Sequence, residues 1–81
     1  MVSNFNLKNW LIEALNHYGR KASIVQVCKY IWETHSKELE ESGDIFYTWQ
    51  YDVGWTAQQL VNKGKLKKVR IKNKSSWELI D

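Results

Sequence analysis

Apolar side chains recur with helical spacing in the first part of this 81-residue chain. They stand three or four residues apart at Leu7, Trp10, Leu11, Ala14, Leu15 and Tyr18. A stripe with this period predicts an amphipathic helix with one buried face. Gly19 follows the stripe, and we expect it to end the helix in the left-handed conformation that glycine adopts without strain.

A second stripe of the same period follows Ser23. Its members are Ile24, Val27, Cys28, Ile31 and His35. Ser23 is a good N-cap and Gln26 stands at the third helical position, so the pair predicts a capping box at the helix start. The polar and acidic stretch SKELEESGD comes next. We therefore expect the second helix to end near His35 or Ser36.

A third and longer helix is predicted between the turn at Gly43-Asp44 and a stop at Gly64. Its expected buried face consists of Phe46, Trp49, Val53, Ala57 and Leu60. Helical geometry then directs a second set of residues to the opposite side. This outer face comprises Thr48, Tyr51, Trp55, Gln58, Gln59 and Asn62.

The pattern changes after Gly64 to apolar and β-branched residues set among cations. Leu66, Val69 and Ile71 predict a strand with a register irregularity near residues 67–68. Residues 72–75 are typical of a tight polar turn, and the alternation around Trp77 predicts a last strand. The chain therefore reads as three helices followed by a hairpin.

This order of elements predicts an α+β fold of the winged helix-turn-helix class, with a C-terminal β-hairpin wing. We expect one domain over residues 1–81, because a chain of this length supports one small core. The segments ASIVQVCKYIWETH and FYTWQYDVGWTAQQLVNKG would form the helix-turn-helix. The third helix would be the one that enters a DNA groove.

The segments VGWTAQQLVNKGKL and SSWELI resemble the N-terminal winged-helix domain of Mrr-type restriction endonucleases. The residues that stand in comparable places are Val53, Trp55, Leu60, Gly64, Leu66, Trp77 and Ile80. The stretch LIEALNHYGRKASIVQVCKYI is similar to the first two helices of that family, so the resemblance covers nearly the whole chain. It departs from the family pattern at Ser75-Ser76, where a wing glycine is usual, and at Gly54 and Gln58, where basic residues are common.

The resemblance implies a DNA-binding domain of a restriction system. Such a domain targets a larger protein, or a partner nuclease, to double-stranded DNA. The resemblance also implies a packing role for Trp55 under the hairpin, whereas helical geometry points the same side chain outward. It does not extend to a nuclease domain, so we expect no enzymatic activity from residues 1–81.

Positive charge is concentrated in the predicted hairpin. The chain has a formal charge of +3, and residues 63–74 carry seven positive charges and no negative one, which leaves −4 for the rest. Cations on a projecting hairpin can neutralise phosphates and release counterions. Alternatively, lysines on a solvated hairpin only prevent edge-to-edge aggregation. The expected DNA contacts on this segment are Lys65, Lys67, Lys68, Arg70, Lys72 and Lys74, with Lys68, Arg70 and Lys72 on one face and Lys65 and Lys67 on the other.

The outer face of the third helix offers amides and hydroxyls that can contact base edges and phosphates. It carries no Lys or Arg, so direct reading of guanine should be weak. An uncharged face of this kind also suits a different class of protein, a winged-helix protein–protein interaction module. Binding to random duplex that depends on salt would separate the two hypotheses.

Other chemistry is poorly represented in the sequence. Cys28 is the single cysteine, which excludes an internal disulfide and favours a reducing, cytoplasmic location. Neither a signal peptide nor a membrane-spanning stretch is expected. Glu13 and His17 are one helical turn apart but have no further ligands beside them, so we expect no metal and no cofactor. We also find no catalytic constellation.

Overall fold

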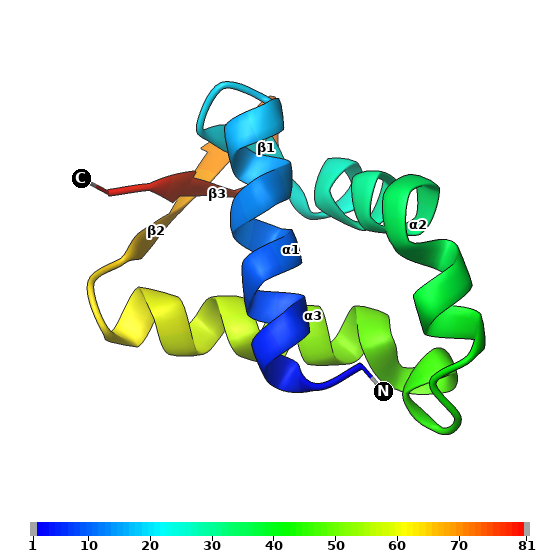
Figure 1. The fold of residues 1–81 in the computed structure, drawn as a ribbon. Coiled ribbons are helices and arrows are strands. Elements are labelled where there is room, and N and C mark those ends of the chain that lie inside the picture. Colours follow the sequence, from blue (N-terminus) through cyan, green and yellow to red (C-terminus); the bar gives the residue numbers. More distant parts are fainter. Residues whose placement is uncertain (1, 81) are drawn as a thin grey trace.

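Three helices and a three-stranded antiparallel sheet make up residues 2–80, which are the part of the chain described by this computed structural model (Figure 1). The elements in chain order are α1 (Asn4–His17), β1 (Lys21–Ser23), α2 (Ile24–Glu40), α3 (Ile45–Asn62), β2 (Leu66–Ile71) and β3 (Lys74–Leu79). The strand order in the sheet is β1-β3-β2, so the last strand is central. The α+β class and the C-terminal hairpin are as the sequence predicts.

Local hydrogen bonds fix the starts of α1 and α2, whereas Asp44 makes no side-chain cap bond at the start of α3. The capping box of α2 is confirmed, because the Gln26 N–H donates to Ser23 Oγ at 3.2 Å and the Ser23 N–H donates to Gln26 Oε1 at 2.9 Å. At α1, the Ser3 N–H donates to Asn6 Oδ1 at 3.0 Å. Gly19 follows α1 with φ 78°, as predicted for its end.

The sequence reading missed β1. Its three residues pair with the central strand, with Lys21 opposite Glu78, Ala22 opposite Trp77 and Ser23 opposite Ser76. Three residues are too few to show a periodic pattern, and their partners lie more than fifty positions away. The loop between α1 and α2 is therefore part of the sheet, and it holds the hairpin against the helices.

The second helix is longer than predicted. It continues to Glu40, but His35 has non-helical angles of φ −129° and ψ 18°, so the helix is kinked where we expected it to end. Leu39 is fully buried and anchors the segment beyond the kink. Burial of Leu39 and the contact of His35 Nδ1 with Glu38 Oε2 at 2.8 Å both hold the polar sequence SKELE in the helix.

The hairpin has a regular register, so the irregularity predicted near residues 67–68 is wrong. Pairing runs without a break from Leu66 opposite Leu79 to Ile71 opposite Lys74. Lys72 and Asn73 form a two-residue loop with φ 50° and 68°, the type I′ pattern that matches the twist of the strands.

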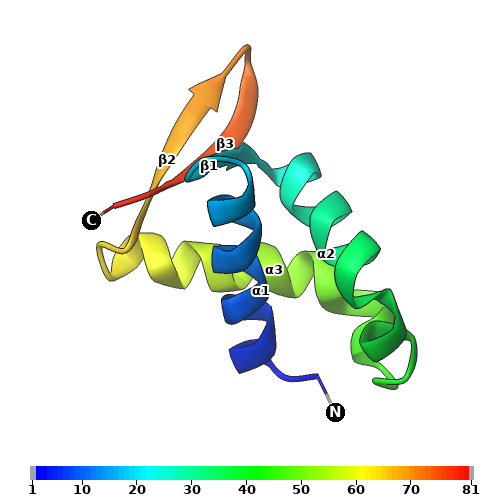
Figure 2. The same cartoon turned by 45° about the horizontal axis from the view of Figure 1, so that its top comes forward.

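The apolar residues of β2 change faces partway along the strand. Leu66 is buried at the base, whereas Val69 and Ile71 lie half-buried on the opposite face. Figure 2 shows why this change is tolerated, because the distal part of the hairpin projects past the helices. A projecting strand has no single buried side to which its pattern must conform.

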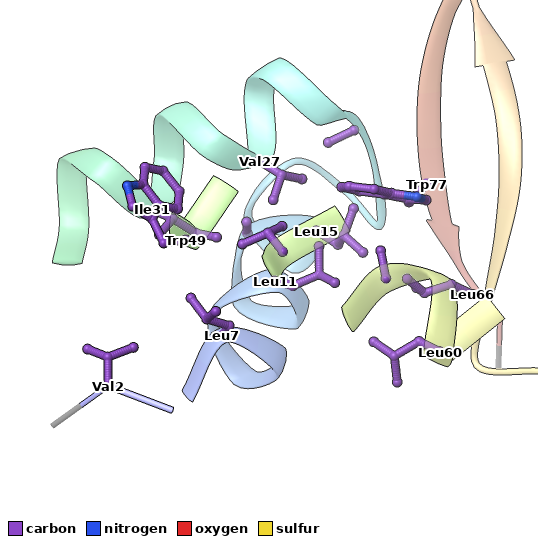
Figure 3. Close-up of a cluster of buried hydrophobic side chains, with 14 of the residues drawn as sticks. Val2, Leu7, Leu11, Leu15, Val27, Ile31, Trp49, Leu60, Leu66 and Trp77 are labelled. Carbon is purple, nitrogen blue, oxygen red and sulfur yellow. The ribbon is translucent and has the colours of Figure 1, made fainter. Parts of the chain in front are cut away.

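The core lies where α1 crosses α3 and where α2 and the hairpin close over them (Figure 3). The third helix buries Trp49, Val53, Ala57 and Leu60 as predicted, while Phe46 is only half-buried. The hairpin contributes Leu66 and Trp77 to the same cluster, as Figure 3 shows. Fully burying a side chain of this size contributes about 1.5–3 kcal/mol, so these anchors fix the hairpin relative to α3.

Within residues 2–80, no helix combines the length and apolar character needed to cross a bilayer.

Candidate nucleic-acid interface

A groove of about 480 Å³ separates the middle of α3 from the hairpin. Its lining comes from α3, from both hairpin strands and from the start of α2, and comprises Ile24, Gly54, Gln58, Lys68, Val69, Arg70, Ser75, Ser76 and Trp77. The groove thus brings the outer side of the third helix and the basic hairpin together. Of the DNA contacts that the sequence predicts, the groove brings Gln58 together with Lys68 and Arg70, and it does not include Thr48, Tyr51, Trp55 and Asn62.

The register of the hairpin explains which cations face this groove. Lys68 lies opposite Trp77, and Arg70 lies opposite Ser75, so their side chains emerge on the sheet face that carries the buried Trp77. That is the face packed against the helices. Lys68 and Arg70 lie farther from the core on this face, where the groove is open, and both are exposed. Their expected common face is confirmed.

The remaining cations of the segment are exposed elsewhere. Lys67 lies on the opposite sheet face, where its Nζ is 3.5 Å from Glu78 Oε1. No other cation of residues 63–74 has an ion pair within the described part of the chain. Lys72 and Lys74 lie at the hairpin tip beside a second hollow, and Lys65 precedes β2. The hairpin therefore presents its charge largely without internal compensation.

Exposed aromatic side chains form a stripe along α3. Tyr47, Tyr51 and Trp55 have exposed fractions of 83%, 69% and 56%. They are four residues apart, so they follow one another on the same side of the helix. The outward direction that helical geometry predicts for Trp55 is confirmed, and the packing role implied by the resemblance is wrong. Tyr47 was missed, although its spacing of four from Tyr51 is visible in the sequence.

The polar residues of the outer face are hydrogen-bonded along the helix. Thr48 Oγ1 donates to Asp52 Oδ2 at 2.9 Å, and Gln58 Nε2 donates to Asn62 Oδ1 at 3.0 Å. Both pairs span one helical turn at the surface. The Gln58 carbonyl oxygen and the Asn62 amide nitrogen take no part in these bonds, so each amide keeps one polar atom for a ligand.

A contrasting polar group, which we call the paired cluster, joins α1 to α2. His35 Nε2 lies 2.9 Å from Glu13 Oε1, and His35 Nδ1 lies 2.8 Å from Glu38 Oε2. The imidazole also stacks on Trp10, with ring centroids 4.0 Å apart and planes 7° from parallel. Glu13 therefore pairs with His35 and not with His17. Among residues 2–80, no three His, Cys, Asp or Glu side chains are arranged to hold a metal ion.

Two side chains near this cluster have perturbed titration. Desolvation on partial burial, followed by the neighbouring Glu13 carboxylate, raises the pKa of the Tyr30 hydroxyl. Burial raises the pKa of the Cys28 thiol, which lies against the core on α2. A thiol that resists ionisation is a poor nucleophile, so Cys28 behaves as a core side chain.

Acidic residues gather at the other end of the molecule. Glu38, Glu40, Glu41 and Asp44 lie at the end of α2 and in the connection to α3. Figure 2 shows this connection and the hairpin tip at opposite ends. The longest extent of the domain is 33 Å, several times the screening length of about 8–10 Å at physiological salt. A polyanion at the hairpin would therefore be little affected by these carboxylates.

Comparison of the chain with protein-family models, with curated proteins and with solved structures finds no match in any of the three.

Proposed function

We propose that this chain is a winged-helix domain that binds double-stranded DNA. In this proposal α3 lies against a groove of the duplex, and the β2–β3 hairpin is the wing that contacts phosphates. The domain would bring a larger protein, or a partner such as a restriction-type nuclease, to DNA. No step of catalysis is assigned to its own residues.

The observation that carries the proposal is the common groove of α3 and the basic hairpin. Lys68 and Arg70 line it from the hairpin, and Gly54 and Gln58 line it from the helix. A duplex that seats α3 would therefore bring its backbone within reach of the two cations. Neutralising phosphates in this way supplies affinity through counterion release.

The charge distribution supports the same orientation. The segment 63–74 carries seven positive charges, while the rest of the chain sums to −4. Four acidic residues, Glu38, Glu40, Glu41 and Asp44, lie in and beside the connection of α2 to α3, at the other end of the molecule from the hairpin tip. Such an asymmetric electrostatic field favours approach of a polyanion to the hairpin side of the domain. The uncharged outer face of α3 would then provide modest sequence preference, and the hairpin most of the affinity.

The test is a titration of the parent and of the Lys68→Ala/Arg70→Ala variant against random duplex over a range of salt concentrations. Loss of two phosphate contacts should flatten the slope of log K against log salt by about 1.8 units. Lys8→Ala/Lys37→Ala is the matched control, because it removes the same charge from exposed helix positions outside the groove. Equal slopes for the two double variants would exclude the groove as the phosphate-binding surface.

A second candidate function is supported by the exposed stripe of Tyr47, Tyr51 and Trp55. An uncharged aromatic surface is also typical of the centre of a protein–protein interface. Under this alternative the domain is a winged-helix interaction module that binds an acidic protein partner. Absence of salt-dependent binding of the parent to random duplex would favour it over the first proposal.

A further inference from the structure

A further hollow, distinct from the groove and from the hollow at the hairpin tip, lies on the exposed side of α3. It is a shallow, open hollow of about 310 Å³ lined by Gln50, Tyr51, Gly54, Trp55 and Gln58. We call it the slot. A Cβ at Gly54 would have no neighbour within 4 Å, and Gly54 has no positive φ. Neither packing nor backbone geometry therefore requires glycine here, although glycine weakens a helix interior relative to alanine.

The residues of the slot suit a planar ring. Tyr51 and Trp55 are four residues apart, which corresponds to about 6 Å along the helix axis. Both rings are exposed, at 69% and 56%, so a planar ligand can stack on either of them. Without a side chain at Gly54, a ligand can reach the helix backbone.

The polar groups beside the slot match the edge of a nucleobase. Gln50 and Gln58 each carry an amide, which offers both a donor and an acceptor. Glutamine amides pair with base edges in this way. No charged side chain lines the slot, so its occupant should be a neutral planar group.

The slot adjoins the groove. Gly54 and Gln58 line both hollows, and Lys68 and Arg70 stand across the groove from them. A planar neutral group at Trp55 and a negative group at Arg70 would therefore be neighbours in one ligand. A nucleotide has this combination of a base and adjoining phosphates.

We propose that the slot binds an unstacked nucleobase, while Lys68 and Arg70 hold the phosphates beside it. This proposal rests on the proposed function and specifies the form of nucleic acid. A paired base inside a duplex has both faces covered by its neighbours, whereas an unpaired base exposes them for stacking on aromatic side chains. The domain therefore binds a strand with an exposed base more tightly than a perfectly paired duplex.

Four labelled DNA probes test this preference by fluorescence anisotropy at one salt concentration. They are a fully paired duplex, the same duplex with one unpaired adenine, the same duplex with an abasic nucleotide at that position, and the corresponding single strand. Stacking of one base should make the unpaired-adenine duplex bind about 5- to 140-fold tighter than the abasic duplex. The abasic probe keeps the phosphates and the bend, so the ratio between the two reports the base alone.

Gly54→Leu tests the location of the base. The new side chain should occupy the slot and bring the adenine-to-abasic ratio close to one. Asn9→Leu is the control, because it adds the same side chain at an exposed position of α1 that lines neither the slot nor the groove. That variant should keep the parental ratio. Thermal melting of both variants verifies folding, and the abasic comparison on the parent needs no variant.

The outcomes separate this proposal from the one on which it rests. Salt-dependent binding to the paired duplex with an adenine-to-abasic ratio near one would overturn the slot and leave the DNA-binding function standing. A ratio that Gly54→Leu leaves unchanged would also overturn it. No binding to any probe would overturn both proposals. Tighter binding of the single strand than of the fully paired duplex supports the slot and identifies single-stranded DNA as the ligand. Tighter binding of the unpaired-adenine duplex as well would show that an unpaired base within a duplex is also accepted.

Discussion

The paired cluster between α1 and α2 and the groove between α3 and the hairpin use the same kinds of side chain in opposite ways. In the cluster, the imidazole of His35 stacks on Trp10 and lies between two carboxylates. The aromatic and polar groups of the cluster therefore have their partners within the chain. In the groove, Lys68 and Arg70 are exposed and have no ion pair within the described chain, and the rings of Tyr51 and Trp55 are exposed on the same helix as Gly54 and Gln58. The first arrangement stabilises the fold, and the second leaves its groups available to a ligand.

The contrast is informative because exposure has a cost. Aromatic rings in water lose the favourable burial that the same rings would gain in a core. Singly exposed apolar residues are ordinary on protein surfaces, but a row of three beside a cationic groove is not. The arrangement of Tyr47, Tyr51 and Trp55 therefore points to binding more than to folding.

The largest expected effect comes from Leu60, which supports the groove from the core. Leu60 is buried on α3, and Figure 3 places it beside Leu66 at the base of the hairpin. Leu60→Ala should lower the free energy of unfolding by roughly 2–5 kcal/mol, measured by urea denaturation followed by tryptophan fluorescence. In a domain of this size that could unfold much of the population.

The neighbouring Val61 gives a control for this substitution, because it is only half-buried. Val61→Ala should be clearly less destabilising than Leu60→Ala. If the two variants unfold at the same urea concentration, Leu60 does not connect α3 to the hairpin, and the groove is less firmly fixed than we describe.

Much of the fold could be predicted from the sequence, because periodicity and caps are local signals. The stripe around Val53 and the capping box at Ser23 each depend on residues within a few positions of one another. Strand β1 could not be found, because its pairing with β3 is non-local. The continuation of α2 past His35 depends on burial of Leu39, a tertiary contact that a polar sequence conceals.

The candidate site was predictable as a list of residues but not as a surface. Charge alone indicates the hairpin, and helical phase alone directs Tyr51 and Trp55 outward. Only the hairpin register shows that Lys68 and Arg70 turn toward α3 while Lys67 turns away. The slot over Gly54 could not be predicted either, because a glycine in a helix does not indicate a hollow until the positions of the surrounding side chains are known.

A matched pair of tryptophan substitutions separates the two regions. Trp10 is half-buried in the paired cluster, so Trp10→Ala should cost about 1–3 kcal/mol of stability. Trp55 is exposed beside the groove, so Trp55→Ala should change stability by no more than about 0.5 kcal/mol. It should instead weaken DNA binding by about 1–3 kcal/mol through lost base stacking.

Each variant serves as the control for the other in urea denaturation and in titration with the unpaired-adenine duplex. Trp10→Ala should bind this probe with parental affinity under conditions where it is folded. Loss of stability without loss of affinity in Trp55→Ala would reverse our assignment and give Trp55 a structural role.

The smallest expected effect is a pH dependence of the free energy of unfolding, which arises from Cys28 on α2 and not from the groove. Burial raises the pKa of the Cys28 thiol above its ordinary value near 9.0. As pH rises through that value, the unfolded chain loses the thiol proton while the folded chain keeps it. The folded state then binds more protons, so stability must fall with rising pH over this window and is unaffected well below it.

Urea denaturation at pH 7 and at pH 9–10 measures the fall in stability. The Cys28→Ala variant isolates this fall from the titration of Tyr and Lys side chains. The parent should lose more stability than Cys28→Ala between the two pH values. An equal loss of stability in both proteins would mean that the thiol ionises as freely in the folded domain as in water. Cys28 would then not be packed against the core, contrary to our description of α2.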